Sequence, residues 1–518
     1  MRLQRHLFLL LPLIAAATGA VVKFWVCDDA FISFRYGKNL ADGFGLVFNP
    51  GTAHPIEGYS NFLWVLVAAA FELVDARPEV WLPAISILCA LVLVWRVYSV
   101  LCEQLQCDPL TASLVCLSLA TFPPFTVWAT GGLATMPFAL LIFLTFESIV
   151  LRERTSTRAA CSWATLLCLI RAEGFAWALV LGLLALIFRK NRRRDVAWYL
   201  TAVLCITCLQ LVIRHAYYDS WWPNTAHVKL GMSQVRWLRG WNYDVVFVLT
   251  FLTPIAASFS AFLLPGRRYR YLVLTSGAMF AGFYGFAVVA GGDYMSMGRF
   301  LVPSLAFQTL LLGALCAFFC ERDRRVLARL VAVAIVALGI IPELRAPLVP
   351  ESFLSRFPFR MSRHAFIGEA DHWRSMKRNS ERWRATGELL ARYTQPGESL
   401  VATSIGNVGY FSNLIIYDRF GLVSRIPATA AASDLGSPGH DSHVTSLYFL
   451  DEKPTYLEAR ISAPNRLPAL ARSQRAFPPP YAPVVFEVSE GRYLVLIKRH
   501  ASREACRNAW QRLRDQWL

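Results

Sequence analysis

The chain has 518 residues, of which 55% are hydrophobic and only 17% are charged, and its mean hydropathy is +0.41. This composition excludes an ordinary soluble protein. Hydrophobic runs close to the bilayer-spanning length of about 20 residues recur over the first two thirds and stop near Pro342. The sequence therefore predicts a polytopic α-helical membrane domain over 1–343, followed by a C-terminal α/β domain over 344–518.

The net charge of +17 raises nucleic-acid binding as an alternative. However, the arginines and lysines gather in short loops beside hydrophobic runs, which is typical of the cytoplasmic loops of membrane proteins. These basic clusters lie at 152–158, 189–194, 267–270 and 322–325. Their placement indicates membrane topology and disfavours nucleic acid as a partner.

The first hydrophobic run follows Arg2 and Arg5 and ends near Val26. Small residues at 18–20 are compatible with a cleaved signal peptide. Because the apolar character continues through Val26, the sequence favours an uncleaved first helix. That helix would enter from the cytoplasm and deliver Asp28 and Asp29 to the outer face.

Further spans are predicted along the chain, giving about eleven with the first helix. They lie near 79–101, 110–127, 133–151, 158–170, 172–188, 196–213, 246–264, 271–290, 299–319 and 326–343. All four basic clusters then fall inside, and the loops at 128–132, 171–173, 214–244 and 291–299 fall outside. The apolar segment 61–74 is short, and the parity holds if it is interfacial or re-entrant.

The C-terminal part mixes helical and strand patterns and indicates a small α/β domain. The expected elements are a helix over 381–393, strands over 399–403 and 414–417, a hairpin of 483–488 with 492–498, and a helix over 502–513 capped by Ser502.

The predicted outer loops contain acidic, basic and aromatic residues that suit group transfer. Asp28 or Asp29 can act as a base toward a sugar hydroxyl. Arg171, Lys229 and Arg299 can bind a donor phosphate. Further candidate substrate-binding residues are Arg35, Glu57, Tyr59, Asn224, His227 and Asp293. Together they favour transfer from a membrane-bound phosphate donor to an acceptor hydroxyl.

Each candidate also has a structural alternative. Carboxylates after a first helix can cap the next one, a lysine at the interface can snorkel, and acids and arginines in one loop can pair with each other. These alternatives concern Asp28–Asp29 as a cap, a snorkelling Lys229, a structural His227, the pairs Arg171–Glu173 and Asp293–Arg299, and Trp221–Trp222 as an interfacial anchor.

The sequence has no Walker loop, no dinucleotide fingerprint and no zinc spacing, which argues against a soluble nucleotide-sugar donor. Its twelve cysteines lie mostly in apolar segments and form no disulfide framework. No cofactor is indicated with certainty. A divalent cation at Asp28–Asp29 stays open as a possibility.

The stretches DDAFISFRYGKNLADGFGLVFNPG (28–51) and PIEGYSNFLW (55–64) resemble the first outer loop of bacterial GT-C-fold membrane glycosyltransferases. The resemblance is greatest to the mycobacterial terminal (β-1,2) arabinofuranosyltransferase family. Later blocks are similar to that family in the same order: WATGGLAT (128–135), RAEG (171–174), YYDSWWPNTAHVK (217–229), GGDYMSMGRFLVP (291–303) and SIGNVGYFSNLIIYDRFGLV (404–423).

The resemblance implies a many-helix fold with its site at the outer face and a polyprenyl-phosphate sugar donor. It assigns the base to Asp28 or Asp29, and the phosphate-binding role to Arg171, Lys229 or Arg299. The family pattern has a Glu where this chain has Ala134. Because that difference can change the sugar or the acceptor, arabinofuranose is one candidate sugar only.

These observations predict a glycosyltransferase of the bacterial inner membrane, multi-pass, with its site and C-terminal domain extracytoplasmic. The acceptor would be an envelope glycan or glycolipid, such as lipopolysaccharide or cell-wall polysaccharide. The simplest mechanism is a single, inverting displacement in which Asp28, with Asp29 as the alternate, takes the proton of the acceptor hydroxyl. A lipid or glycolipid transporter is the alternative from another class, although it would more often show internal repeats, which are not seen. A non-catalytic scaffold for envelope assembly is a third.

Overall fold

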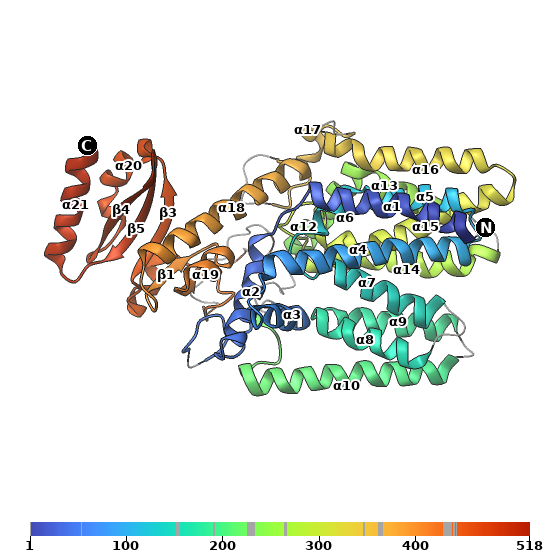
Figure 1. Cartoon of the computed structure of the whole chain (residues 1–518), viewed down its shortest axis with the longest axis horizontal. Coiled ribbons are helices and arrows are strands. Elements are labelled where there is room, and N and C mark those ends of the chain that lie inside the picture. Colours follow the sequence, from blue (N-terminus) through green and yellow to red (C-terminus); the bar gives the residue numbers. More distant parts are fainter. Residues whose placement is uncertain are drawn as a thin grey trace.

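In the computed structural model of the chain, a bundle of long helices carries a small sheet domain at one of its ends (Figure 1). The structure describes residues 2–52, 54–151, 156–189, 192–224, 234–263, 267–344, 348–360, 366–427, 438, 441 and 443–518. The end of the bundle that carries the sheet domain is the domain end, and the opposite end, where basic side chains gather, is the basic end.

The bundle is built from nearly parallel apolar helices. Six described segments are long and apolar enough to cross a membrane: α1 (Arg2–Val22), α4 (Pro78–Glu103), α10 (Arg193–Tyr218), α14 (Arg267–Ala290), η3 (Arg299–Ser304) with α15 (Leu305–Glu321), and α16 (Arg325–Ile340) with η4 (Ile341–Leu344). Shorter apolar helices lie among them: α5 (Pro109–Ala120), α6 (Pro123–Trp128), α7 (Thr135–Thr145) with η1 (Phe146–Leu151), α8 (Thr157–Ile170) and α9 (Gly174–Phe188). Every predicted span is therefore helical, but the described helices include only six or seven of full spanning length, fewer than the predicted eleven or so.

The predicted span over 246–264 is not one straight helix. The chain forms α12 (Gln234–Phe251) and α13 (Thr253–Leu263), which meet at an angle of 92°. Leu252 at the junction has φ +56°, a left-handed conformation that interrupts the helical hydrogen bonds. The predicted loop over 214–244 is also shorter than expected, because α10 continues to Tyr218 and α12 already begins at Gln234.

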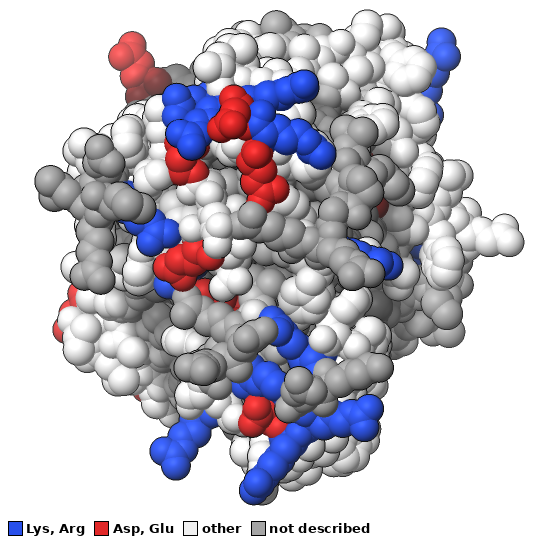
Figure 2. All heavy atoms as spheres, turned by 90° about the vertical axis from the view of Figure 1, so that its right-hand side faces the viewer, with Lys and Arg blue, Asp and Glu red and all other residues white. Residues whose placement is uncertain are grey.

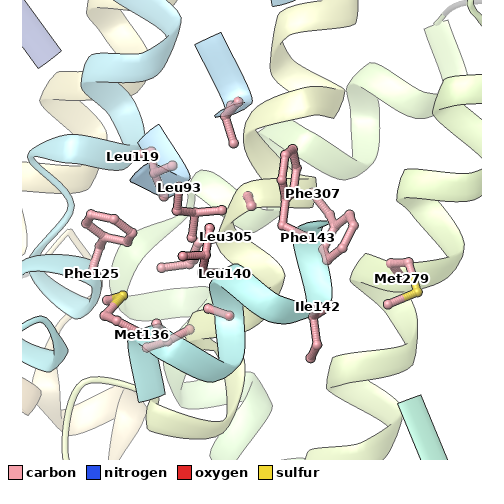
Figure 3. Packing of buried hydrophobic residues seen from close by; sticks show 14 of the residues in the cluster. Leu93, Leu119, Phe125, Met136, Leu140, Ile142, Phe143, Met279, Leu305 and Phe307 are labelled. Carbon is pink, nitrogen blue, oxygen red and sulfur yellow. The ribbon is translucent and has the colours of Figure 1, made fainter. Parts of the chain in front are cut away.

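The bundle core consists of interlocking aliphatic and aromatic side chains (Figure 3). Phe307 of α15 lies between Phe143 of α7 and Phe146 of η1, with ring centroids 6.1 and 5.0 Å away. Leu93 and Leu119 extend the same cluster toward α4 and α5. This continuous core holds the scaffold on which the domain-end loops are placed.

Two helices close the domain end of the bundle. They are α2 (Asp28–Ala41) and α3 (Phe62–Glu72), which pack against each other. A Cβ at Gly37 would lie 2.8 Å from the Cβ of Ala68, so the two backbones approach closely. The 11 residues of α3 are too few to span a bilayer, which fits the interfacial or re-entrant alternative for the segment 61–74.

The C-terminal domain has a five-stranded sheet of order β2-β1-β3-β5-β4. Pairing of β1 with β2 and β3 is parallel, and pairing of β5 with β3 and β4 is antiparallel. The strands are β1 (Ser399–Ala402), β2 (Ile415–Asp418), β3 (Tyr456–Ser462), β4 (Tyr481–Ser489) and β5 (Arg492–Arg499). The helices are α17 (Glu351–Leu354), α18 (Glu369–Tyr393), α19 (Gly406–Ser412), η5 (Ser446–Glu452), η6 (Pro464–Arg466), α20 (Leu467–Arg472), η7 (Gln474–Ala476) and α21 (Arg503–Trp517).

Most predicted elements of this domain are confirmed. The two early strands and the terminal hairpin form, and the Ser502 side chain caps α21 by accepting a hydrogen bond from the backbone N of Ala505 at 3.0 Å. The helix predicted from residue 381 begins earlier, at Glu369. The central strand β3 was not predicted, because Glu458 and Arg460 interrupt its apolar pattern.

The C-terminal domain packs directly on α2. Phe31 of α2 contacts Tyr410 and Phe411 of α19, with ring centroids 5.5 and 5.3 Å apart. Figure 1 shows α18 running from the bundle to the sheet and α19 beside α2. The first outer loop therefore meets residues about 380 positions later in the chain.

Lys and Arg side chains gather at the basic end, with fewer acidic ones among them (Figure 2). Exposed members include Arg193 and Arg194 at the start of α10 and Arg322, Arg324 and Arg325 between α15 and α16. Two of the four basic clusters predicted from the sequence thus lie together, away from the sheet domain.

Candidate active site

Two cavities meet at the domain end, on either side of Asp29. The wider one, of about 410 Å³, lies between the bundle helices, and the narrower one, of about 140 Å³, lies between the bundle and the C-terminal domain. The residues that line both cavities are Asp29, Ile32, Asp293, Arg299, Leu422 and Pro438. Asp29 and Arg299 therefore stand where two bound molecules would face each other.

The two adjacent aspartates have different surroundings. The Asp28 carboxylate accepts hydrogen bonds from the backbone N of Gly406 at 3.2 Å, and from the backbone N and side-chain Nδ2 of Asn407 at 2.8 and 3.0 Å. Burial raises the pKa of Asp28 to about 6, while these hydrogen bonds act in the opposite direction. Asp28 lines the narrower cavity and is held by protein donors, whereas Asp29 lines both cavities.

Two of the predicted phosphate-binding residues lie in the wider cavity, each in an ion pair. Arg299 donates to Asp293 through Nε at 2.7 Å and Nη2 at 3.0 Å, and both side chains are buried. Arg171 donates to Glu173 through Nε at 2.5 Å. The pairing alternatives are therefore confirmed for both arginines. Because both guanidinium groups still line the cavity, they are positioned to meet an anion there.

The wider cavity is apolar on its bundle side. Phe175 and Ala176 of α9 and Phe286, Val289 and Ala290 of α14 form this wall. Val289 is 56% exposed on the helix surface, so the wall leads toward the lipid-facing side of the bundle. The cavity thus combines a charged inner end with an apolar side, as a lipid-linked phosphate requires.

The narrower cavity is lined on its other side by the C-terminal domain. Asn379 and Trp383 of α18 and Asp418 at the end of β2 contribute side chains. Asp418 accepts hydrogen bonds from the backbone N atoms of Phe420 and Leu422. Burial raises the pKa of Asp418 to about 6, and the nearby Asp29 charge acts in the same direction. Carboxylates, an amide and an indole are groups that recognise sugar hydroxyls and ring faces.

Arg35, a predicted substrate-binding residue, holds the domains together. Its guanidinium donates to the carbonyl O of Phe48 at 2.6 Å, of Gly409 at 2.5 Å and of Leu414 at 2.6 Å, and to Asn49 Oδ1 at 3.1 Å. These bonds use all three of its nitrogens, so Arg35 links the first loop to the C-terminal domain. Arg35 does not line either cavity.

Glu57 and Asn224, two further predicted substrate-binding residues, also form structural contacts. Glu57 pairs with Arg214 of α10 at 2.5 Å, and its carbonyl accepts from the backbone N of Asn224. Asn224 Nδ2 donates to the carbonyl O of Gly421 and of Leu422. Tyr59 lines the wider cavity, and its hydroxyl lies 3.1 Å from that of Tyr218.

Lys229 and His227 lie outside the described residues, so their predicted roles stay predictions. Trp221 and Trp222 are exposed, at 52% and 57%, which fits an interfacial anchor. Trp222 also lines the mouth of the wider cavity.

Several residues of the site escaped the sequence analysis. Arg239 of α12 lines the wider cavity and pairs with Asp441 at 2.5 Å. Asp418 and Trp383 line the narrower cavity. A lone arginine in an amphipathic helix carries no sequence signal, but the match of 404–423 to a family block did point to the segment that contains Asp418.

No group of three or more potential metal ligands occurs in the part of the chain that the structure describes. The Asp28 carboxylate already accepts hydrogen bonds from three N–H donors. Asp28 and Asp29 are thus the two acidic side chains that the described residues offer to a cation at this place.

A family model described as a domain of unknown function (DUF8728) matches residues 371–508, most of the C-terminal domain. No curated protein matches the chain. Two crystal structures of ArnT from Cupriavidus metallidurans are similar over almost the whole length of both chains. The structure bound to undecaprenyl phosphate has 13% identity and a TM-score of 0.54, and covers 96% of this chain and 98% of that one. The apo structure has 13% identity and a TM-score of 0.55, with 95% and 97% covered.

This likeness shows that the chain has the GT-C fold, with a helical membrane domain and a C-terminal sheet domain. The fold predicted from the sequence is thereby confirmed. The likeness to arabinofuranosyltransferases in particular stays a prediction.

Proposed function

We propose that this protein is a membrane glycosyltransferase that moves a sugar from a polyprenyl-phosphate donor to a glycan or glycolipid of the cell envelope. The observation that carries the proposal is the meeting of two cavities at one unpaired acid, Asp29, and one cavity-facing arginine, Arg299. One of the similar structures holds undecaprenyl phosphate, which supports a lipid-linked donor.

In the proposed reaction, the donor occupies the wider cavity. Its tail leaves along the apolar wall between α9 and α14, and its phosphate lies beside Arg171 and Arg299. Planar guanidinium groups bind phosphate oxygens through paired hydrogen bonds, and they stabilise the negative charge that grows on the leaving group. Lys229 stays a further candidate for this role, and Arg239 joins it because it lines the same cavity.

The acceptor occupies the narrower cavity. An Asp29 carboxylate oxygen takes the proton of its hydroxyl, the hydroxyl oxygen forms a bond to the anomeric carbon, and the bond from that carbon to the phosphate oxygen breaks. The electron pair of the broken bond leaves with the polyprenyl phosphate. A positioned carboxylate of this kind contributes about 10² to 10⁴-fold to the rate. This single displacement inverts the anomeric configuration.

The proposal places the protein in the bacterial inner membrane with the site extracytoplasmic. The gathering of basic residues at the end opposite the site supports this orientation, because such residues face the cytoplasm. Arabinofuranose stays the candidate sugar suggested by the sequence blocks, with Ala134 in the wider cavity as the difference most able to change it.

The test is a transfer assay in nanodiscs with a panel of radiolabelled polyprenyl-phosphate sugars and cell-envelope glycan as acceptor. We expect incorporation from one donor. A folded protein that transfers no sugar from any donor, yet moves labelled lipid between leaflets, would establish a transporter instead.

A further inference from the structure

The short segment that carries Asp29 is held by the C-terminal domain. Ser380 Oγ of α18 donates to the carbonyl O of Val26 at 2.7 Å, and Asn407 Nδ2 donates to Ser380 Oγ at 3.0 Å. Asn407 Nδ2 and the backbone N of Asn407 also donate to the Asp28 carboxylate. These contacts enclose residues 26–28, immediately before Asp29.

The same segment is fixed on its bundle side. The backbone N of Cys27 donates to the carbonyl O of Gly131 at 3.1 Å, and Trp25 Nε1 donates to the carbonyl O of Val127 at 2.9 Å. The segment therefore lies between two rigid bodies, and its position depends on both. Consecutive Cα atoms are about 3.8 Å apart, so a displacement of Asp28 moves Asp29 with it.

The fit at α19 leaves no spare room. A Cβ at Gly406 would lie 1.9 Å from the main-chain O of Asp28. Asn407 is completely buried, although it belongs to a seven-residue helix of the C-terminal domain. A fully buried polar side chain that bridges two elements fixes one relative arrangement of them.

We propose that Asp28, Ser380 and Asn407 form a latch through which the C-terminal domain positions Asp29, so that this domain completes the catalytic site. In this account Asp28 and Asn407 are positioning residues, and the region matched by the domain of unknown function has a role in the chemical step. Only the expected changes in kcat rest on the proposed transferase function.

Exchanging the two side chains separates positioning from catalysis. D28N and N407D each remove or reverse a hydrogen bond of the latch, and a displacement of Asp29 by about 1 Å costs about 100-fold in kcat. N407D alone places a second carboxylate against Asp28, and D28N in the same chain relieves that contact, because the new amide donates to the new carboxylate. We therefore expect D28N/N407D to recover about tenfold in kcat over N407D, with the KM for the donor unchanged. If Asp28 were itself the base, adding D28N to N407D would lower kcat further.

A second readout does not depend on transfer. The amides of Gly406 and Asn407 should exchange hydrogen faster in D28N and in N407D than in the wild type, and more slowly in D28N/N407D than in N407D. Matched controls are D451N and N465D, which make the same two substitutions at exposed positions of the C-terminal domain.

The two readouts distinguish the possible failures. Absence of transfer in the wild-type protein, with latch-dependent amide exchange, would contradict the proposed function and leave the latch standing. Near wild-type kcat in N407D, or a double variant that improves neither kcat nor amide protection over N407D, would overturn the latch.

Discussion

Asp28 and Asp29 show how neighbouring residues of one type acquire different roles. Successive residues of a helix point about 100° apart, so the first turn of α2 directs Asp28 toward α19 and leaves Asp29 at the cavities. The sequence could place this acidic pair at the domain end. It favoured Asp28 over Asp29 as the base, whereas the function proposed from the structure uses Asp29. The reason is that the donors that bind Asp28 come from about 380 positions later in the chain and leave no local signal.

At the residue scale, the two arginine pairs should respond differently to substitution. Arg299→Gln leaves the buried Asp293 without its partner, which costs about 3–5 kcal/mol of stability. Arg171→Gln affects a more exposed pair, so the loss of stability should be smaller. Both variants should raise the donor KM about tenfold or more, through a lost charge-assisted hydrogen bond to phosphate. Thermal unfolding and donor titration measure the two effects.

Arg374→Gln is the control for these variants, since it breaks an exposed ion pair with Asp371 that lies outside the wider cavity. An unchanged donor KM in both Arg171→Gln and Arg299→Gln would remove these residues from the phosphate site.

Asp418 should make stability depend on pH. Its folded-state pKa is raised from the ordinary 3.8 to about 6, so the folded protein holds this proton more tightly. The stabilisation is therefore complete below about pH 4 and is lost as the pH rises through 6. A shift of about two pKa units corresponds to about 3 kcal/mol at most. The difference in Tm between the wild type and Asp418→Asn should become less favourable to the wild type between pH 4 and 7, and a constant difference would contradict the assignment.

At the scale of elements, the hydrophobic patterns correctly predicted the helices and strands that depend on local sequence. The bundle helices, the strands β1, β2, β4 and β5 and the cap at Ser502 follow from local periodicity and capping chemistry. The 92° bend at Leu252 was not predicted, although Pro254, which cannot continue a helical hydrogen-bond ladder, lies two residues beyond it. The strand β3 was not predicted either, because tertiary pairing with β1 and β5 creates it.

The close approach of α2 to α3 is open to a matched test. Gly37→Ala would bring a Cβ to 2.8 Å from Ala68, and overpacking of this kind costs about 1–3 kcal/mol. Gly277→Ala on α14 meets nothing within 4 Å and should stabilise its helix by about 1 kcal/mol. Thermal unfolding in detergent should thus move in opposite directions for the same substitution. Equal shifts would show that the helices do not pack as described.

At the scale of the whole molecule, the cluster of basic loops and the candidate site lie at opposite ends of the bundle. Basic side chains gather at one end, and the C-terminal domain, the cavities and Asp29 lie at the other (Figures 1 and 2). We expect alkaline phosphatase fused after Leu518 to be active and green fluorescent protein fused there to be dark, because the positive-inside rule places this end outside. The reverse pattern would overturn the extracytoplasmic orientation.

The most direct test of the whole account is single-turnover transfer by Asp29→Asn beside the wild type, with undecaprenyl-phosphate binding measured in parallel. The account predicts a loss of about 10² to 10⁴-fold in the rate of the chemical step, with lipid affinity and thermal stability unchanged. Transfer by Asp29→Asn at near the wild-type rate would contradict the account, because no other acid lies unpaired where the two cavities meet in the described part of the chain.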